Sequence, residues 1–343
     1  MKRHLNTLFI TTQGAYLAKE GETVAVKVDG EIVLRVPVHT LGGVVCFGQV
    51  SCSPYLMGFC AENGVAISFL TENGRFLAKV QGPVSGNVLL RREQYRRADD
   101  PQASSFIARA VVTGKVANCR TVLQRSLRDH SEKIDADAVS QASQSLSHSI
   151  RRLQGDSPLD FVRGLEGDAA NSYFEVFDHL ITSQKNDFSF NERNRRPPLD
   201  NVNCLLSFLY TLLMHDVRAA LETVGLDPAV GFLHRDRPGR YGLALDLMEE
   251  FRPFLADRLT LSLINLCQVQ GKGFNKKESG AVCMDDETRK SVLVAYQKRK
   301  QEEILHPFIK ETVTIGLLPH VQAMLMARYL RGDLDCYPPF LWK

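Results

Sequence analysis

Apolar and polar residues alternate over short segments in the first 81 residues of the chain. Runs rich in Val, Ile, Thr and Phe that are separated by turn residues are typical of short β-strands. The dipeptides Asp29-Gly30 and Asn73-Gly74 each lie between two such runs and favour tight hairpin turns. One helix is expected at Pro54–Glu62. The predicted strands are Leu5–Thr11, Ala15–Lys19, Val24–Val28, Ile32–Val36, Val44–Phe47, Ala66–Thr71 and Phe76–Val80.

The pattern changes after Gly82-Pro83, where the break indicates a linker over residues 83–100. From residue 101 onward, apolar residues recur at helical spacing. Asp200 is expected to cap one helix, and Pro253 to kink or break another. The chain is therefore predicted to be an α+β protein, with an N-terminal β-sandwich-like domain (1–82) and a larger all-α domain (101–343). The predicted helical segments are 101–154, 158–182, 202–224, 242–265, 285–305 and 318–330.

The composition is that of an ordinary globular protein. The chain has 343 residues, of which 44% are hydrophobic and 24% charged, and this length favours two domains. No stretch approaches the roughly 18 consecutive apolar residues of a membrane span, and the N-terminus turns polar too early for a secretory signal. We therefore expect a cytoplasmic protein with no membrane partner. None of the eight cysteines forms a C-x-x-C pair, so a thiolate zinc site is not expected.

Basic residues are concentrated in two places. Residues 86–130 hold nine Lys or Arg against four Asp or Glu, although the net charge of the chain is only +3. Such an excess is typical of phosphate binding, and a solvated helix face explains it equally well. The segment 271–280 adds Lys272, Lys276 and Lys277 among glycines. It predicts a flexible basic loop that contacts phosphates without base selectivity.

Candidate chemistry is concentrated in residues 231–253, GFLHRDRPGRYGLALDLMEEFRP. His234 lies in a loop of this stretch, before a basic segment. Asp246, Glu249 and Glu250 follow three and four positions apart, so they share one face of the predicted helix. Carboxylate oxygens with one imidazole suit Mg²⁺ or Mn²⁺ better than a softer metal. The alternative is a solvated helix face beside an ordinary loop histidine.

A further carboxylate, Glu166, lies between Gly164 and Gly167 in a predicted helix that Ser157 would cap. Glycine destabilises a helix by up to about 1 kcal/mol relative to alanine, so this pair indicates close approach of a ligand or another chain. Tight helix packing beside a solvated Glu166 is the alternative. If the helices bring Glu166 and His234 together, the cluster suits metal-assisted phosphodiester chemistry. The residues alone thus predict a metal-dependent enzyme that acts on nucleic acid.

Four stretches of the sequence resemble one known family. Together and in this order they are similar to the CRISPR-associated integrase, the universal adaptation-stage endonuclease and integrase of CRISPR systems. The resemblance covers nearly the whole chain, and the ending CYPPFLWK is similar to the form found in type I systems. The stretches are GLEGDAANSYF (164–174), NRRPPLDNVNCLLSFLY (194–210), GFLH (231–234) and LALDLMEEFRP (243–253).

The resemblance implies a site for Mg²⁺ or Mn²⁺ in the helical domain. By position in the family's motifs, Glu166, His234 and Glu249 would bind the ion. Asp246 would be a fourth catalytic residue, which either ligates directly or supports a ligand. Many members have aspartate where this chain has Glu249, whose longer side chain still supplies an oxygen.

DNA contacts are expected from basic residues next to this site and from the segment 271–280. Arg252 and Asn203 also match family positions and are expected to be supporting residues. The expected DNA-binding residues are Arg235, Arg237, Arg240, Arg252, Lys272, Lys276 and Lys277.

The implied activity is insertion of short DNA fragments into the CRISPR repeat array. A 3′-hydroxyl of the fragment would attack a repeat phosphodiester by metal-assisted transesterification, on double-stranded and branched DNA. The family forms homodimers, usually through the β domains, and two dimers flank a dimer of a small ferredoxin-like adaptation protein in a hetero-hexamer. Two other functions stay open: a stand-alone metal-dependent, structure-specific repair nuclease that uses water, and a non-catalytic nucleic-acid-binding scaffold.

Overall fold

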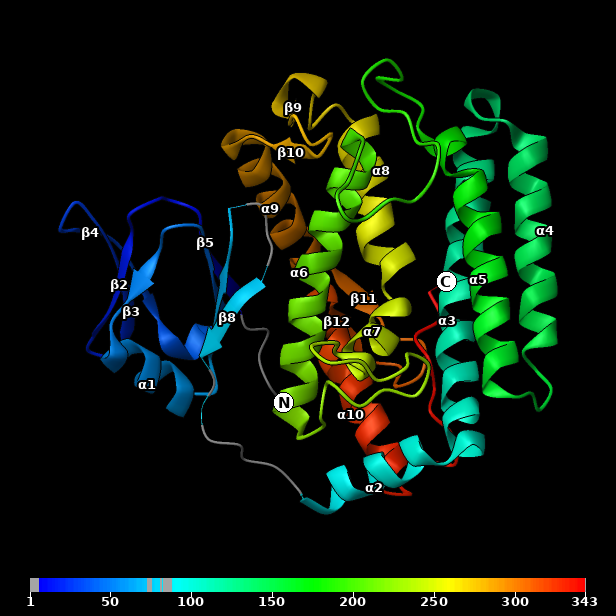
Figure 1. Ribbon diagram of the computed structural model, residues 1–343, viewed down its shortest axis with the longest axis horizontal. Helices are drawn as coiled ribbons and strands as arrows, with labels where there is room; N and C mark the ends of the chain where they lie inside the picture. The colour runs from blue at the N-terminus through cyan, green and yellow to red at the C-terminus, as the bar shows by residue number, and fades with distance from the viewer. Residues whose placement is uncertain (1–5, 73–75, 81, 83–87, 343) are drawn as a thin grey trace. The chain divides into compact units, whose positions relative to one another are not determined.

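The computed structural model of the protein describes residues 6–72, 76–80, 82 and 88–342 (Figure 1). The chain divides into two compact units. The smaller unit comprises Met1–Ser85 and Met284–Gln301, and the larger one comprises Gly86–Cys283 and Glu302–Lys343. Strands predominate in the first 80 residues and helices in the remainder, which confirms the predicted α+β class.

Two four-stranded sheets make up most of the smaller unit. Buried side chains of both sheets and of helix α1 (Pro54–Glu62) form a single core, as predicted for a sandwich-like domain. The first sheet has the order β1 (Asn6–Ile10), β5 (Leu41–Phe47), β7 (Ala66–Leu70) and β8 (Phe76–Val80). The second has the order β4 (Glu31–Pro37), β3 (Thr23–Val28), β2 (Tyr16–Glu20) and β6 (Ser51–Cys52).

The seven predicted strands correspond to strands of the structure, and within residues 6–80 the two-residue β6 is the one described strand that was not predicted. The β1–β5 and β5–β7 pairs are parallel, whereas β7–β8 and β2–β3–β4 are antiparallel. Asp29 and Gly30 have φ angles of 52° and 84° between β3 and β4, so the predicted tight turn is confirmed. The other predicted turn, Asn73-Gly74, and the first residue of the predicted strand Leu5–Thr11 lie outside the described residues.

Long helices make up most of the larger unit (Figure 1). α3 is the longest at 30 residues, and the Asp100 side chain caps it by accepting from two backbone N–H groups. Asp200 caps α6, as predicted, by accepting from the backbone N–H of Asn203. Helices in this unit are α2 (Val88–Asp99), α3 (Pro101–His130), α4 (Ala136–Arg152), α5 (Leu159–Glu175), α6 (Asn201–Val224), α7 (Gly242–Glu249), α8 (Arg258–Asn265) and α10 (Leu318–Leu330).

The structure differs from the predictions at four points. Residues Val88–Asp99 form helix α2 of the larger unit, although the Gly/Pro break predicted a linker there. Helix α9 (Asp286–Gln301) belongs to the smaller unit. The sequence did not reveal this, because a helical period does not show what the helix packs against. Ser157 does not cap α5; its hydroxyl bonds the carbonyl of Gly155 instead. Two small two-stranded sheets also interrupt the predicted all-α region: β9 (Phe274–Lys276) with β10 (Val282–Met284), and β11 (Glu303–Leu305) with β12 (Thr312–Thr314).

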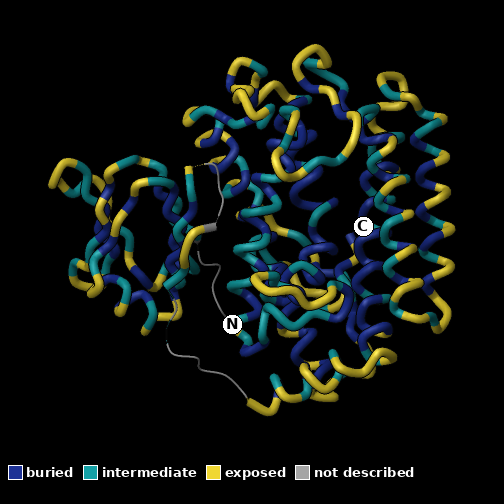
Figure 2. The backbone as a smooth tube through the Cα atoms, viewed as in Figure 1, coloured by how far each residue is buried: buried dark blue, intermediate teal, exposed yellow. Residues whose placement is uncertain are grey.

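A short π-helix, Arg252–Asp257, joins α7 to α8. Pro253 therefore interrupts the regular helix without ending it, since proline removes one backbone N–H donor. Figure 2 shows that α3, α6 and α10 are largely buried, whereas exposed residues collect on α2 and α4. Among the described residues, α6 alone is long and apolar enough to cross a membrane, but 56% of its most apolar window is buried in the protein, as in a core helix.

Candidate active site

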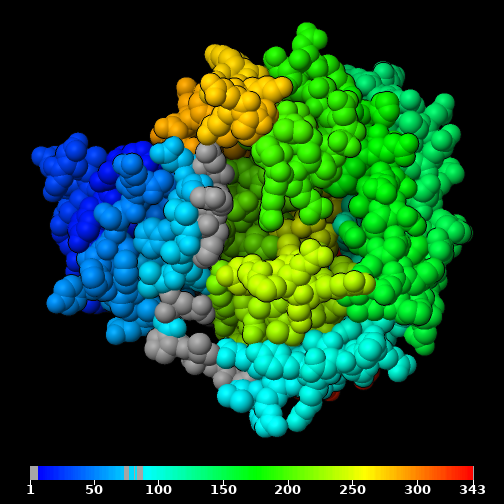
Figure 3. All heavy atoms as spheres, viewed as in Figure 1, coloured from blue at the N-terminus to red at the C-terminus, as the bar shows by residue number. Residues whose placement is uncertain are grey.

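A cavity of about 760 Å³ opens on the surface of the larger unit. Figure 3 shows the surface hollowed between α5, the loop before α6 and the loop that follows it. Positively charged side chains predominate in the lining, with carboxylates and one imidazole among them. The charged lining residues are Lys115, Asp160, Arg163, Glu166, Arg193, Arg195, His234, Arg235, Arg237, Arg240, Glu249, Arg252 and Asp257.

The loop that carries His234 is held by one buried carboxylate, Asp246 of α7, which is only 1% exposed. Asp246 accepts hydrogen bonds from the backbone N–H groups of Phe232 (2.6 Å), Leu233 (2.9 Å) and His234 (3.0 Å). Its Oδ1 atom also lies 2.7 Å from Nδ1 of the His234 ring. With Nδ1 engaged in this way, Nε2 is turned towards Glu249, whose Oε1 atom lies 4.0 Å away.

Glycine makes this loop geometry possible. A Cβ atom on Gly231 would lie 2.5 Å from the carbonyl carbon of Gly242 and 2.8 Å from an oxygen of Asp246. Because the first contact is with backbone, it could not be relieved by a side-chain rotation. The backbones of the loop and of the first residue of α7 therefore pack directly on each other, and this contact sets the place of His234.

Glu249 ends α7 and is 1% exposed. Burial alone would raise its pKa, but the charges of Arg252, Lys115 and His234 outweigh burial and lower the pKa to about 2. Oε1 lies 2.7 Å from Arg252, and Oε2 lies 2.8 Å from the ammonium of Lys115. Oε2 nevertheless has no hydrogen-bond partner of acceptable geometry among the described residues. Its close contact among the described residues is therefore the ion pair with the Lys115 ammonium.

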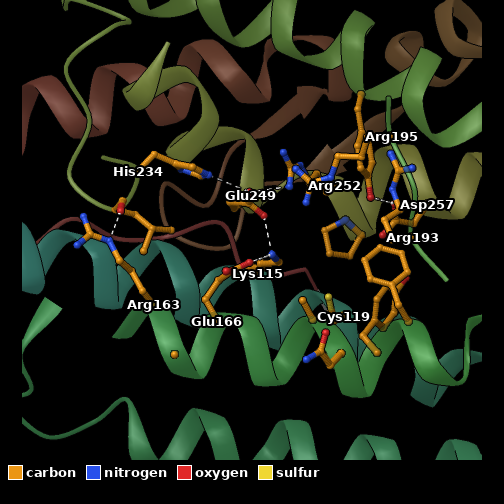
Figure 4. Close-up of a pocket in the computed structure, with 18 of the residues that line it drawn as sticks. Lys115, Cys119, Arg163, Glu166, Arg193, Arg195, His234, Glu249, Arg252 and Asp257 are labelled. Atoms are coloured by element: carbon orange, nitrogen blue, oxygen red, sulfur yellow. Dashed lines mark hydrogen bonds and ion pairs between the residues drawn. The ribbon is translucent and has the colours of Figure 1, made fainter. Parts of the chain in front are cut away.

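Glu166 reaches the same point from α5 (Figure 4). Its Oε1 atom pairs closely with Lys115 of α3, which thereby lies between Glu166 and Glu249. Burial would lower the pKa of Lys115, but the two glutamates outweigh it and raise the pKa, so the ammonium stays charged. Because Lys115 stands between the carboxylates, no three His, Cys, Asp or Glu side chains of the described chain converge as a closed ligand set.

The residues nonetheless fit a hard divalent ion. Two carboxylates and one imidazole nitrogen face the same cavity, and the Oε2 atom of Glu249 lacks a hydrogen bond. Oxygen ligands with one imidazole are typical of Mg²⁺ and Mn²⁺ sites. The expected ligands Glu166, His234 and Glu249 are thus brought together, whereas Asp246 has its oxygens occupied by donors from the His234 loop.

The two glycines beside Glu166 face open space. A Cβ atom on either Gly164 or Gly167 would meet no atom within 4 Å, so the alternative of tight helix packing is wrong. Gly164 lines the cavity. Glu166 is also not an ordinary solvated residue, since its carboxylate pairs with the buried Lys115.

The predicted DNA-binding residues fall into two groups. Arg235, Arg237, Arg240 and Arg252 line the cavity, although Arg252 is largely buried in its pair with Glu249. The three lysines of the 271–280 segment are exposed and are not part of the cavity lining. That segment is also more ordered than the predicted loop, since it contains strand β9.

Several lining residues were not predicted, namely Lys115, Arg163, Arg193 and Arg195. Arg193 donates to the side-chain oxygen of Asn203 at 2.6 Å, which gives Asn203 its supporting role in holding the loop before α6. Lys115 had one signal in the sequence: it interrupts an apolar face of the predicted helix. The basic segment 86–130 that contains it is not one solvated face, because Lys115 is buried.

An arginine-rich cavity with an imidazole and two carboxylates in its lining is typical of one class of protein, the enzymes that act on phosphodiesters. The family model described as CRISPR associated protein Cas1 matches residues 8–298. Over its full length, the chain is 58% identical to the whole of "CRISPR-associated endonuclease Cas1 1" of Chlorobaculum tepidum. It is 53% identical to the whole of "CRISPR-associated endonuclease Cas1 2" of Rhodospirillum rubrum. The chain therefore belongs to the Cas1 family of CRISPR-associated endonucleases, which confirms the family and the enzyme class expected from the four sequence stretches.

Solved structures agree on the fold. A casposase bound to its integration product superposes with a TM-score of 0.83 at 21% identity, covering 99% of this chain and 95% of the casposase. A chain of a Cas6-RT-Cas1–Cas2 complex superposes with a TM-score of 0.81 at 22% identity, covering 100% of this chain and 36% of the longer one. At these identities the likeness establishes the common architecture, and the relatives in sequence establish the family.

Proposed function

We propose that the protein is the metal-dependent DNA integrase and endonuclease of CRISPR adaptation, which inserts new spacer DNA into the repeat array. The observation that carries this proposal is that Glu166, His234 and Glu249 line one arginine-rich cavity. The casposase found bound to its integration product has the same architecture and supports strand transfer over simple hydrolysis.

We assign Glu166, His234 and Glu249 as the ligands of one Mg²⁺ or Mn²⁺ ion. When bound, the ion would polarise the scissile phosphoryl group and stabilise the leaving oxygen. Asp246 does not ligate in this scheme. Its carboxylate holds the His234 backbone and the Nδ1 side of the ring, so that Nε2 is presented to the cavity.

The arginines of the cavity would bind and orient the DNA strands. Arg163 is fixed by a 2.7 Å hydrogen bond to the carbonyl of Leu233, and Arg193 by Asn203, so both guanidinium groups have defined positions. Planar, preorganised guanidinium groups suit phosphate oxygens. Held in this way, an attacking 3′-hydroxyl and a target phosphodiester would meet at the carboxylates, with Arg235, Arg237 and Arg240 at the rim. The exposed lysines of 271–280 would contact DNA outside the cavity.

The assembly proposed here is a homodimer formed through the β domain, residues 1–82. Two dimers would flank a dimer of a small ferredoxin-like adaptation protein, and the whole would bind double-stranded and branched DNA. The Cas1 chain of the Cas6-RT-Cas1–Cas2 complex supports a partner of this kind. A cytoplasmic location follows from a chromosomal DNA substrate.

A strand-transfer assay on labelled branched DNA tests the function. Wild type should rejoin strands with Mn²⁺ or Mg²⁺ and not with chelator, whereas His234→Ala should lose strand transfer and keep most DNA binding, because phosphate contacts carry the affinity. His148→Ala, on the exposed face of α4, is the matched control and should behave as wild type. Cleavage by water alone would favour the repair nuclease. Unchanged activity in His234→Ala would contradict the site.

A further inference from the structure

Lys115 occupies an unusual position for a lysine. It lies within α3, only 8% of its side chain is exposed, and its neighbours on the buried face of the helix are apolar, among them Val111, Val112 and Val116. A buried ammonium is costly unless it is paired. Its partners are Glu166 of α5 and Glu249 of α7, and the described residues offer the Nζ atom no other partner.

The two carboxylates that hold Lys115 are the same two that are assigned to the metal ion. An ammonium and a divalent ion cannot occupy one position between the same oxygen atoms. The charges lead to the same conclusion: Glu166, Asp246 and Glu249 supply three negative charges, and Lys115 and Arg252 two positive ones. Among these five groups the net charge is one negative with Lys115 in place, and the ammonium would repel a divalent ion at short range.

The two cations differ in their freedom to move. The Arg252 guanidinium lies 2.7 Å from Glu249 and 4.8 Å from the centre of the Tyr210 ring, so it is fixed on two sides. Lys115 is held only by the two glutamates, on a flexible four-carbon chain. The Glu166 side chain is 28% exposed and lines the cavity, so the Lys115–Glu166 ion pair can be reached from the cavity (Figure 4). An entering ion would therefore move Lys115 and leave Arg252 in place.

We propose that Lys115 is an internal counter-ion that occupies the metal position between Glu166 and Glu249. It holds the two carboxylates together in the metal-free protein and is displaced when the ion binds. This inference rests on the metal site of the proposed function. Lys115 is thus a positioning residue: it keeps α3, α5 and α7 in register at the site and lowers the affinity for the ion through competition.

Titration of Mn²⁺ into the metal-free, full-length protein tests the competition without any DNA. Lys115→Met, which keeps the buried chain and removes the charge, should bind Mn²⁺ about tenfold more tightly or better by calorimetry. In chelator the melting temperature of the same variant should be lower than that of wild type, because two close carboxylates lose a shared cation. Excess Mn²⁺ should then raise the melting temperature of the variant by more than it raises that of wild type. Lys133→Met, at an exposed position, is the control and should change neither quantity.

Lys115→Gln keeps a hydrogen-bond donor and covers the case in which the methionine variant does not fold. Equal or weaker Mn²⁺ binding in a folded variant would overturn the inference. Glu166→Gln separates this failure from failure of the site. If wild type does not bind Mn²⁺, or if Glu166→Gln binds it as well as wild type does, the proposed metal site is wrong and the inference fails with it. If that binding is present but insensitive to position 115, only the inference fails.

Discussion

Glu249 and Glu250 are neighbours in the chain and both are buried, yet they lie in opposite environments. Glu249 faces the cavity and the cations Lys115 and Arg252, which lower its pKa to about 2 after overcoming the effect of burial. Glu250 faces the C-terminal segment. Burial raises its pKa to about 8, and the hydrogen bonds donated to it reduce this effect only in part.

The donors around Glu250 are neutral. Tyr337 donates its hydroxyl at 2.7 Å, Gln322 its amide at 2.9 Å, and Phe340 its backbone N–H at 2.7 Å. A Cβ atom on Gly114 would lie 3.1 Å from the Glu250 side chain, so the tail, α3 and this glutamate pack closely. Both oxygens of the Glu250 carboxyl group therefore accept hydrogen bonds from the protein.

The comparison teaches that charge and burial alone do not make a metal site. Both carboxylates are buried, but only Glu249 retains an oxygen without a hydrogen bond and faces a second carboxylate across a cavity. The cavity region pairs its carboxylates with cations, as the proposed metal site requires, whereas the Glu250 region anchors the tail on the helices.

The largest effect is expected from breaking the anchor. Phe340 is completely buried against Phe251 and Phe254, so Phe340→Ala should reduce the free energy of unfolding by about 3–5 kcal/mol in urea denaturation. Leu341→Ala, next to it and 38% exposed, should cost about 0.5 kcal/mol. The folded fraction of Phe340→Ala should bind Mn²⁺ like wild type. Equal destabilisation by the two variants would show that the tail is not anchored as described.

A middle-sized effect is expected on the cavity side. Asp246→Asn removes the charge that orients His234 and leaves backbone N–H groups poorly paired, so Mn²⁺ affinity should fall about 10–100-fold. Glu250→Gln is the matched control, since it makes the same acid-to-amide change at a buried residue of the adjacent region. Calorimetry with both variants measures the difference. Equal losses of affinity would mean that the two regions act as one.

The last effect is gradual, and it is small only when taken over a single pH unit: stability depends on pH through Glu250. Its pKa in the folded protein, about 8, lies above the usual 4.5, so the stability it contributes is fully present below pH 4.5 and lost as the pH rises through 8. Between these values the slope would be at most about 1.4 kcal/mol per pH unit. Urea unfolding from pH 5 to 9 should show a smaller slope for Glu250→Gln than for wild type. Parallel curves would contradict a protonated Glu250.

Most of the fold could be predicted because local patterns decide it. The alternation in the first 81 residues and the Asp29-Gly30 turn specify strands, and α6 and α10 follow from their apolar stripes and flanking signals. Two helices, α2 and α9, were assigned to the wrong part of the chain. α2 follows a Gly/Pro break that indicated a linker, and the helical period of α9 is compatible with either unit. Packing, which a period does not encode, decided both.

The site could be predicted in part for a similar reason. Glu166, His234 and Glu249 stand in recognisable stretches, and their side chains suit a hard ion. Asp246 shares a helix face with Glu249, but only the folded loop shows that its oxygens are used to hold His234. Glu250 carries the same charge one residue later, and nothing in its local sequence separates it from Glu249.

The sequence by itself determined the family, the α+β class, the strands, the helices and the residues with metal-binding chemistry, since each depends on residue type and short spacing. Only the tertiary structure decided which charges meet. Lys115 is 51 residues from its partner Glu166, and Gln322 is 72 residues from its partner Glu250. Contacts of this kind place Glu249 at the cavity and Glu250 against the tail. The physical reason is that the energy of a buried charge depends on its partners, and those partners come from elsewhere in the chain.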